Sequence, residues 1–158
     1  MMNRTEKLRA LVLLFASGTG LVACAGAPVQ DMSNARQTIR AAHEAGAMDY
    51  SPESLRAADK SLQNAKQAID LHKYQEARQE AQAATQAAAA ARNMALAINS
   101  AQSAIENAHL KNIPADQAEA VLKQAIAAAA QGDEEKTIEL ALKARALAEK
   151  GEAERPHQ

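Results

Sequence analysis

Apolar residues recur at alternating spacings of three and four along this chain of 158 residues, the pattern of helices with one buried face. The series at 55–69 follows Ser51 and Pro52, which suit an N-cap and a first helical position. A second series starts at Tyr74 and meets no glycine or proline before Pro114, which opens a further helix. At 1.5 Å per residue the second series predicts one helix of roughly 50 Å.

One shorter helix is expected before this pattern and one after it. The first covers about 32 to 45, with Asp31 or Ser33 as its cap and Gly46 just past its end. The last begins after the Gly-Asp pair at 132–133, where the glycine ends the preceding helix and the aspartate caps the next. The spacing therefore predicts about five helices.

The composition favours helices throughout. Alanine, the best helix former, makes up about a quarter of the chain, tryptophan is absent, and Tyr50 and Tyr74 are the only aromatic residues after position 23. Aromatic and β-branched residues are too sparse to build strands. We therefore expect an all-α fold, an elongated antiparallel helical bundle that occupies residues 32–150, followed by a polar tail at 151–158.

The two halves of the chain share a pattern at two constant offsets. Positions of the first helix reappear 66 residues later: Ala35, Ile39, Ala42 and His43 match Ala101, Ile105, Ala108 and His109. Later positions reappear after 60: Leu62, Ala65, Ala81, Ala84 and Ala88 match Leu122, Ala125, Ala141, Ala144 and Ala148. The pattern predicts two duplicated three-helix units that share the long helix. The alternative is a helical period common to unrelated alanine-rich segments.

The N-terminal segment has the layout of an export signal. Basic residues precede an apolar run, Ala10 to Val22, that is too short to cross a bilayer as a mature helix. The run ends in Leu21-Val22-Ala23-Cys24, which includes the only cysteine of the chain. This tetrapeptide resembles the lipobox of bacterial lipoproteins, which implies that residues 1–23 are removed and that Cys24 is acylated. The alternative is an ordinary signal with a chance cysteine.

A lipid on Cys24 would fix the location of the protein. Several acyl chains hold a protein to a bilayer far more firmly than the single chain that gives reversible binding. Ala25 is not the aspartate associated by family analogy with inner-membrane retention, which favours the periplasmic face of the outer membrane. Residues 24–31 are small, polar and interrupted by Pro28, so we expect them to form an extended tether of roughly 20 to 25 Å.

The charge balance offers no surface for nucleic acid. Without residues 1–23 the chain has 15 Lys and Arg against 18 Asp and Glu, a net charge of −3. These charges are spread along the chain without basic blocks, so we expect neither nucleic-acid binding nor a polybasic membrane patch. Membrane attachment would then depend on the lipid.

Candidate chemical groups are few, and each has a structural explanation. His43 and His109 occupy equivalent helix C-termini, where a cation suits the helix dipole better than it suggests a metal ligand. Tyr50 and Tyr74 lie near opposite ends of one helix, so each is expected to plug a loop rather than form a ligand cage. The acidic pair at 134–135 stands in a first helical turn, not across a cleft. We expect no catalytic, cofactor-binding or metal-binding residues.

Three short motifs stand out within residues 35–91. They are Ala45-Gly46-Ala47, Tyr50-x-Pro52 and Tyr74-x-x-Ala77, set among the apolar positions Leu55, Ala58, Leu62, Ala65, Ile69, Ala81 and Ala84. The segment resembles the bacterial domain-of-unknown-function 4398 family, whose members are alanine-rich envelope lipoproteins or segments that precede an OmpA-like domain. The resemblance implies an envelope location and a helical architecture, but no activity. The second half departs from it, because Glu134 stands where Tyr74 would fall.

These observations lead to a functional expectation. We expect a lipid-anchored, non-catalytic structural or protein-interaction module of the periplasm, with the membrane as one partner through Cys24. A homo-oligomer or a helical envelope protein is expected as a second partner, in contact with the alanine runs at 87–91 and 127–130. The alternative is a carrier that holds an apolar ligand or an unfolded client between its helices. A carrier needs a pocket lined by large apolar groups, and alanine seams close such space.

Overall fold

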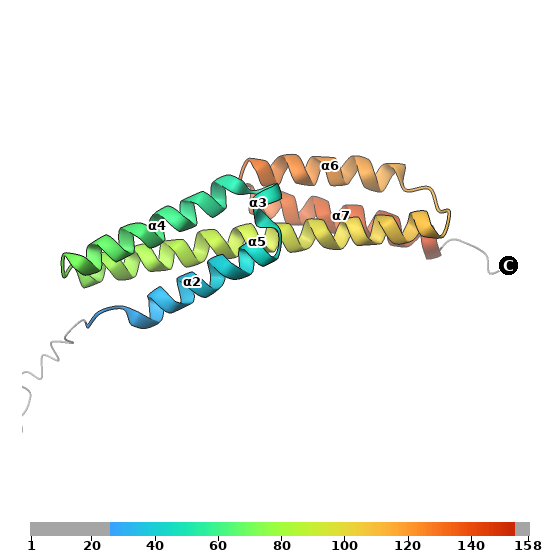
Figure 1. The fold of residues 1–158 in the computed structure, drawn as a ribbon. Coiled ribbons are helices and arrows are strands. Elements are labelled where there is room, and N and C mark those ends of the chain that lie inside the picture. The colour runs from blue at the N-terminus through green and yellow to red at the C-terminus, as the bar shows by residue number, and fades with distance from the viewer. Residues whose placement is uncertain (1–25, 154–158) are drawn as a thin grey trace, which may run out of the picture.

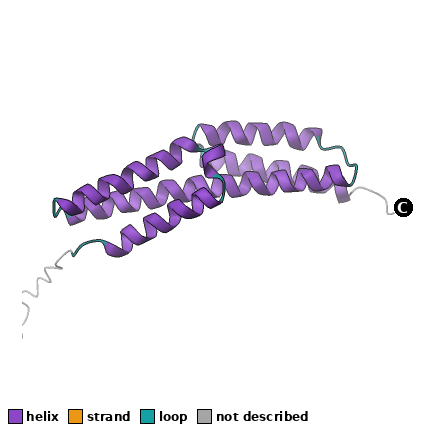
Figure 2. Ribbon diagram, in the orientation of Figure 1, coloured by secondary structure: helices purple, strands orange, loops and turns teal. Residues whose placement is uncertain are grey.

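The computed structural model describes residues 26–153, which form six helices and no strand (Figure 2). The all-α bundle is therefore confirmed, with one helix more than the expected five. The signal segment and Cys24 lie outside the described residues. The helices are α2 (Val29–Glu44), α3 (Ala47–Tyr50), α4 (Pro52–Asp70), α5 (Tyr74–Leu110), α6 (Asp116–Ala130) and α7 (Glu134–Ala153).

The helices form a rod with α5 as its central helix (Figure 1). With 37 residues, α5 is about 55 Å long and runs the length of the molecule. α2 and α4 pack along its first half, and α6 and α7 pack along its second half. The start of α2 and the end of α7 lie at opposite ends of the rod (Figure 1).

The rod contains the same three-helix arrangement twice. The first unit consists of α2, α4 and residues 74–91 of α5; the second consists of residues 92–110 of α5 together with α6 and α7. In each unit the third helix packs closely along the other two, which contact each other much less. Consecutive long helices run antiparallel, so the first and third helices of each unit are parallel (Figure 1).

The buried positions of the two units correspond at the offsets found in the sequence. At an offset of 66, Met32, Ala35, Ile39 and Ala42 correspond to Ile98, Ala101, Ile105 and Ala108, and all eight are buried. At an offset of 60, Leu55, Ala58, Leu62, Ala65, Ala68, Ala81, Ala84 and Ala88 correspond to Ala115, Ala118, Leu122, Ala125, Ala128, Ala141, Ala144 and Ala148, all buried. Equivalent residues of the two units are therefore alike in burial as well as in residue type.

The turns correspond as well. Gly46 and Asn112 follow the first helix of their units with φ of 78° and 54°, and they are 66 residues apart. His72 and Gly132 follow the second helix with φ of 57° and 75°, and they are 60 residues apart. A left-handed residue directly after a helix is a common way to end it. Equivalent backbone bonds follow, from Lys73 N to Ala68 O (2.8 Å) and from Asp133 N to Ala128 O (3.1 Å).

The short helix α3 explains why the offset changes between the first and second helices. From Ala42 to Leu55 the first unit has six more residues than the second has from Ala108 to Ala115, and α3 forms within this insertion. Four residues are too few to show a helical period, so the spacing of apolar residues could not predict α3. The second unit makes the same connection without a helix, through Ile113 and Ala115, which are both buried.

The structure corrects three helix starts or caps. α2 begins at Val29, so the end of the expected tether is helical, and neither Asp31 nor Ser33 caps it. The physical reason is Met32, which is buried and donates its backbone N–H to Pro28 O at 3.0 Å. α6 begins at Asp116 rather than at the preceding proline, and Ser51 precedes α4 without a side-chain cap bond. The cap of α7 is as expected, because Oδ1 of Asp133 accepts the N–H of Lys136 at 3.1 Å.

Candidate functional surfaces

The predicted lipidation site, Cys24, lies outside the described residues, so the structure does not test it. The described chain begins at Gly26 and enters α2 three residues later. This entry lies at the end of the rod that also carries the turn between α4 and α5 (Figure 1). A group attached two residues before Gly26 is therefore connected to this end, and the turn between α5 and α6 lies at the far end.

The joint between the two units is closed by Tyr50 of α3, whose ring packs against both core clusters. Its hydroxyl lies 3.0 Å from Oδ1 of Asn99 and 2.9 Å from Oε1 of Gln102, both on α5. Asn99 Nδ2 in turn donates to the carbonyl of Ala45 at 2.9 Å. Tyr50 is thus a plug, as expected. Its two partners on α5 were missed, because nothing in the sequence marks residues some fifty positions apart as neighbours.

Tyr74 makes a different and more exposed contact. Its hydroxyl lies 3.1 Å from Nδ1 of His72, and the two rings meet edge to face with centroids 6.0 Å apart. Tyr50 and Tyr74 flank α4 at its two ends, and the 19 residues of α4 span about 28 Å. The structure therefore does not bring the two tyrosines together into an aromatic cage.

The histidines lie where the sequence placed them. His43 and His109 occupy the last turns of α2 and α5. His109 Nε2 lies 2.8 Å from Oε1 of Glu119 at the start of α6, and both side chains are exposed. Within residues 26–153, no group of three or more His, Cys, Asp or Glu side chains could hold a metal ion.

The two alanine runs serve the bundle itself. Ala88 and Ala91 are fully buried in the first run, and Ala128 and Ala129 are buried in the second. Small side chains let neighbouring helices approach closely, so these positions pack inside the rod. Their buried faces are not available to an external partner, whereas Ala127 and Ala130 of the second run are exposed.

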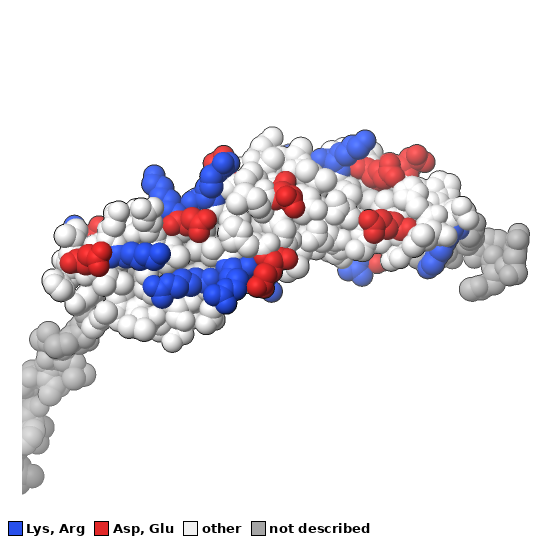
Figure 3. All heavy atoms as spheres, in the orientation of Figure 1, with Lys and Arg blue, Asp and Glu red and all other residues white. Residues whose placement is uncertain are grey.

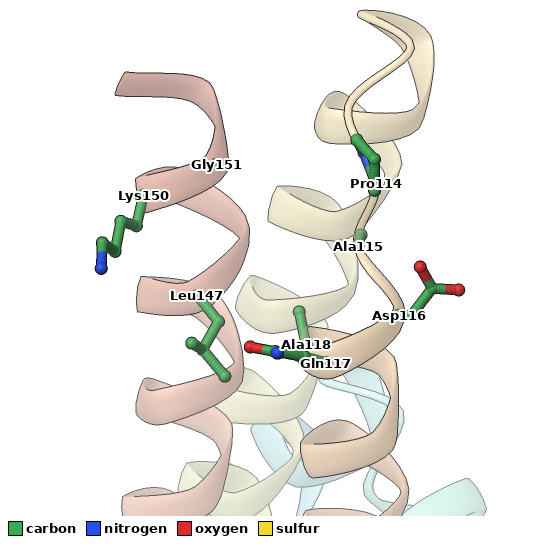
Figure 4. A pocket seen from close by; sticks show the side chains of 8 residues that line it. All are labelled: Pro114, Ala115, Asp116, Gln117, Ala118, Leu147, Lys150 and Gly151. Carbon is green, nitrogen blue, oxygen red and sulfur yellow. The ribbon is translucent and has the colours of Figure 1, made fainter. Parts of the chain in front are cut away.

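A cleft of about 330 Å³ lies at the far end of the rod, between the start of α6 and the end of α7 (Figure 4). Leu147 and Gln117 extend toward the gap between the helices, whereas Asp116 and Lys150 point outward (Figure 4). The charged side chains therefore do not converge on one point, as groups that act together on a substrate would.

Two further clefts are also open to solvent. One, of about 390 Å³, follows the α5–α7 groove and is lined by Ser100, Ser103, Ala104, Asn107, Arg145 and Glu149. The other, of about 340 Å³, lies along residues 72–76 at the opposite end of the rod. Neither has the large apolar lining that an enclosed ligand would require.

The charged residues are distributed over the surface without a large area of one sign on the visible face (Figure 3). Ion pairs such as Lys73 with Glu76 and Arg145 with Glu149 join side chains that are about half exposed. Such pairs contribute little to stability and indicate a solvated surface. Among the described helices, none is both long and apolar enough to cross a membrane.

Comparison with known proteins gives one match. The family described as "Domain of unknown function (DUF4398)" matches residues 30–113, a longer segment than the 35–91 on which the motifs lie. The matched segment holds the first unit, all of α5 and the turn after it, while α6 and α7 lie beyond it. No curated protein and no solved structure matches the chain. Because the match covers more than half of its residues, the chain belongs to the DUF4398 family.

Proposed function

We propose that this protein is a non-catalytic structural or interaction module of the bacterial cell envelope, held by a lipid on Cys24 to the periplasmic face of the outer membrane. The observation that carries the proposal is the lipobox-like Leu21-Val22-Ala23-Cys24. It stands five residues before the rod begins at Val29. A stably anchored chain would then hold its helical rod by one end.

The shape of the molecule supports this role. α5 is a continuous helix of about 55 Å, so the second unit lies several nanometres from the end that carries the anchor. A rod held in this way can carry a binding surface away from a membrane or set a spacing. The described clefts are open and lack a large apolar lining, and the charged groups of the cleft between α6 and α7 do not converge, which favours an interaction role over catalysis and over the carrier alternative.

The lipid anchor is tested by replacing the cysteine that would carry the acyl chains. We expect Cys24→Ser to abolish acylation and to release the protein from the outer-membrane fraction, as measured by intact mass and by fractionation. The matched control is Ala25→Asp, which keeps the cysteine and should keep the lipid mass while shifting the protein to the inner membrane. If the native protein carries no lipid mass, or if Cys24→Ser still fractionates with outer membranes, the lipid-anchor proposal is wrong.

A further inference from the structure

The two units differ in chemistry at four equivalent positions along the groove between their first and third helices. The first unit has Gln30, Asp31, Arg78 and Gln82 there, and the second unit has Leu96, Ala97, Ile138 and Leu142. We call the second set the α5–α7 patch. Equivalent positions have the same exposure. Gln30 and Leu96 are exposed, as are Gln82 and Leu142, whereas the other two pairs are half-buried.

In the first unit these positions form a polar cluster. Gln82 Nε2 donates to Oδ1 of Asp31 at 3.2 Å, and Arg78 Nε lies 3.5 Å from the other carboxylate oxygen of Asp31. The first unit therefore packs its first and third helices with polar side chains at this level. The leucines of the α5–α7 patch are not needed to build the unit, yet Leu96 remains 45% exposed and Leu142 55% exposed. Single exposed apolar residues are common on protein surfaces, but adjoining ones form a patch that suits an interaction surface.

Two hydrogen bonds show that the α5–α7 patch is continuous across the groove. Asn93 Nδ2 donates to Oε1 of Glu134 at 3.0 Å, and Arg145 Nη1 donates to Oγ of Ser100 at 3.3 Å. Leu96 lies three residues after Asn93 and four before Ser100, so it shares their helix face. The apolar side chains of α5 and α7 are therefore neighbours on the strip between these two bonds.

The charges that flank the patch indicate its partner. Glu135, Ile138, Leu142 and Arg145 follow one another at spacings of three, four and three, so they lie on one face of α7. The order from Glu135 to Arg145, acid, apolar, apolar, base, complements itself when one copy is reversed. Within its own chain Arg145 also pairs with Glu149 at 2.6 Å. An antiparallel second copy would pair Glu135 with Arg145 and Ile138 with Leu142, twice by symmetry. A parallel copy would place acid against acid and base against base.

We propose that the α5–α7 patch binds a second copy of this chain, with the two α7 helices antiparallel about a two-fold axis between Ile138 and Leu142. The proposal deepens the interaction role proposed above and rests on it, but it does not require the lipid. The patch is small, so the dimer is weak in solution. The N-terminal ends of the two copies then lie at opposite ends of the dimer.

A charge swap tests the proposal on the purified full chain, in detergent with micelles in large excess over protein. Mass is measured by light scattering as the protein concentration rises. Glu135→Arg and Arg145→Glu each place two like-charged pairs across the two-fold axis, and we expect each to raise the dimer dissociation constant at least about tenfold. Arg145→Glu also removes the pair with Glu149, so circular dichroism checks that this variant is folded. The double variant Glu135→Arg with Arg145→Glu should restore dimerisation to within about threefold. Ten residues on α7 span about 15 Å, so the two side chains cannot restore each other within one copy.

The first unit supplies substitutions that the fold already accepts. Ile138→Arg and Leu142→Gln introduce the side chains found at the equivalent positions 78 and 82, and we expect both variants to be folded monomers by circular dichroism and light scattering. Gln82→Lys, in the first unit, should leave the dimer unchanged. A native chain that is monomeric at every concentration overturns the proposal, as does a dimer that survives Leu142→Gln or a charge swap that fails to restore it. Fractionation of Cys24→Ser tests the lipid anchor separately.

Discussion

The first and second units have the same helix order, the same left-handed turn positions and most of their buried positions in common, but they differ around their edges. The first unit joins α2 to α5 through Asp31, Arg78 and Gln82, whereas the second has Ala97, Ile138 and Leu142 at the equivalent places. The first unit also has α3, which the second lacks. The comparison teaches that regularly spaced small residues determine how the three helices pack. The half-buried positions at the edge of this core can be polar, as in the first unit, or apolar, as in the second.

A charge in the alanine core gives the largest expected effect and tests whether both units have the same core. Ala88 is fully buried, and its equivalent Ala148 is 2% exposed. We expect Ala88→Arg and Ala148→Arg each to destabilise the protein by more than about 4 kcal/mol, because each leaves an unpaired charge in a close-packed interior. Urea unfolding followed by circular dichroism measures the loss. The exposed neighbour Gln86→Arg is the control and should change stability by less than about 0.5 kcal/mol.

A pair of equivalent leucines in the two cores gives the next effect. Leu62 and Leu122 are 8% and 9% exposed, so truncation removes similar buried area in each unit. We expect Leu62→Ala and Leu122→Ala each to cost about 2 to 4 kcal/mol in the free energy of unfolding. A loss below about 0.5 kcal/mol at one of them would show that the two cores are not equivalent.

A substitution at Tyr50, in the joint between the units, is expected to lower stability by a smaller amount. Tyr50→Phe removes the hydroxyl that lies between Asn99 and Gln102 and leaves their oxygens without this donor. We expect a loss of about 1 to 2 kcal/mol in denaturant unfolding. Tyr74→Phe removes a hydroxyl that contacts the exposed His72, and this control should cost less than about 0.5 kcal/mol. Equal losses would contradict the role of Tyr50 as the plug of the joint.

The equivalent turns give the smallest effect. Gly132 has a φ of 75° and no side chain to strain, whereas His72 has a similar φ of 57°. We expect Gly132→Ala to cost about 1 kcal/mol and His72→Gly to cost less or to stabilise slightly, because only the first change introduces a Cβ at a left-handed position. Thermal unfolding of the two variants distinguishes these signs. A stabilising Gly132→Ala would show that the turn is not left-handed in solution.

The sequence predicted the long helices because their apolar spacing extends over four or more turns and their core is made of one kind of residue. It predicted the repeat for the same reason, since equivalent positions keep a constant offset. It did not predict α3, whose four residues are too few for the apolar spacing to recur. It also did not predict the start of α2, which follows from the burial of Met32 rather than from a polar cap.

The candidate surfaces were less predictable than the fold. The contacts of Tyr50 join residues distant in sequence, and the α5–α7 patch becomes visible only when equivalent positions are compared at equal exposure. Cys24 is the opposite case, because its identification depends on a local motif that the described structure does not include.

The central claim is that two equivalent units share one unbroken α5. The most direct measurement is the distance between spin labels on cysteines introduced at Leu71 and Leu110, in a chain in which Cys24 is replaced by serine. Both positions are exposed; Leu110 is the last residue of α5, and Leu71 lies in the turn three residues before α5 begins. The 37 residues of α5 predict a single distance of about 55 Å by pulsed electron resonance. A distance of about half that length would mean that α5 breaks at the joint and that the units fold side by side, which would contradict the account.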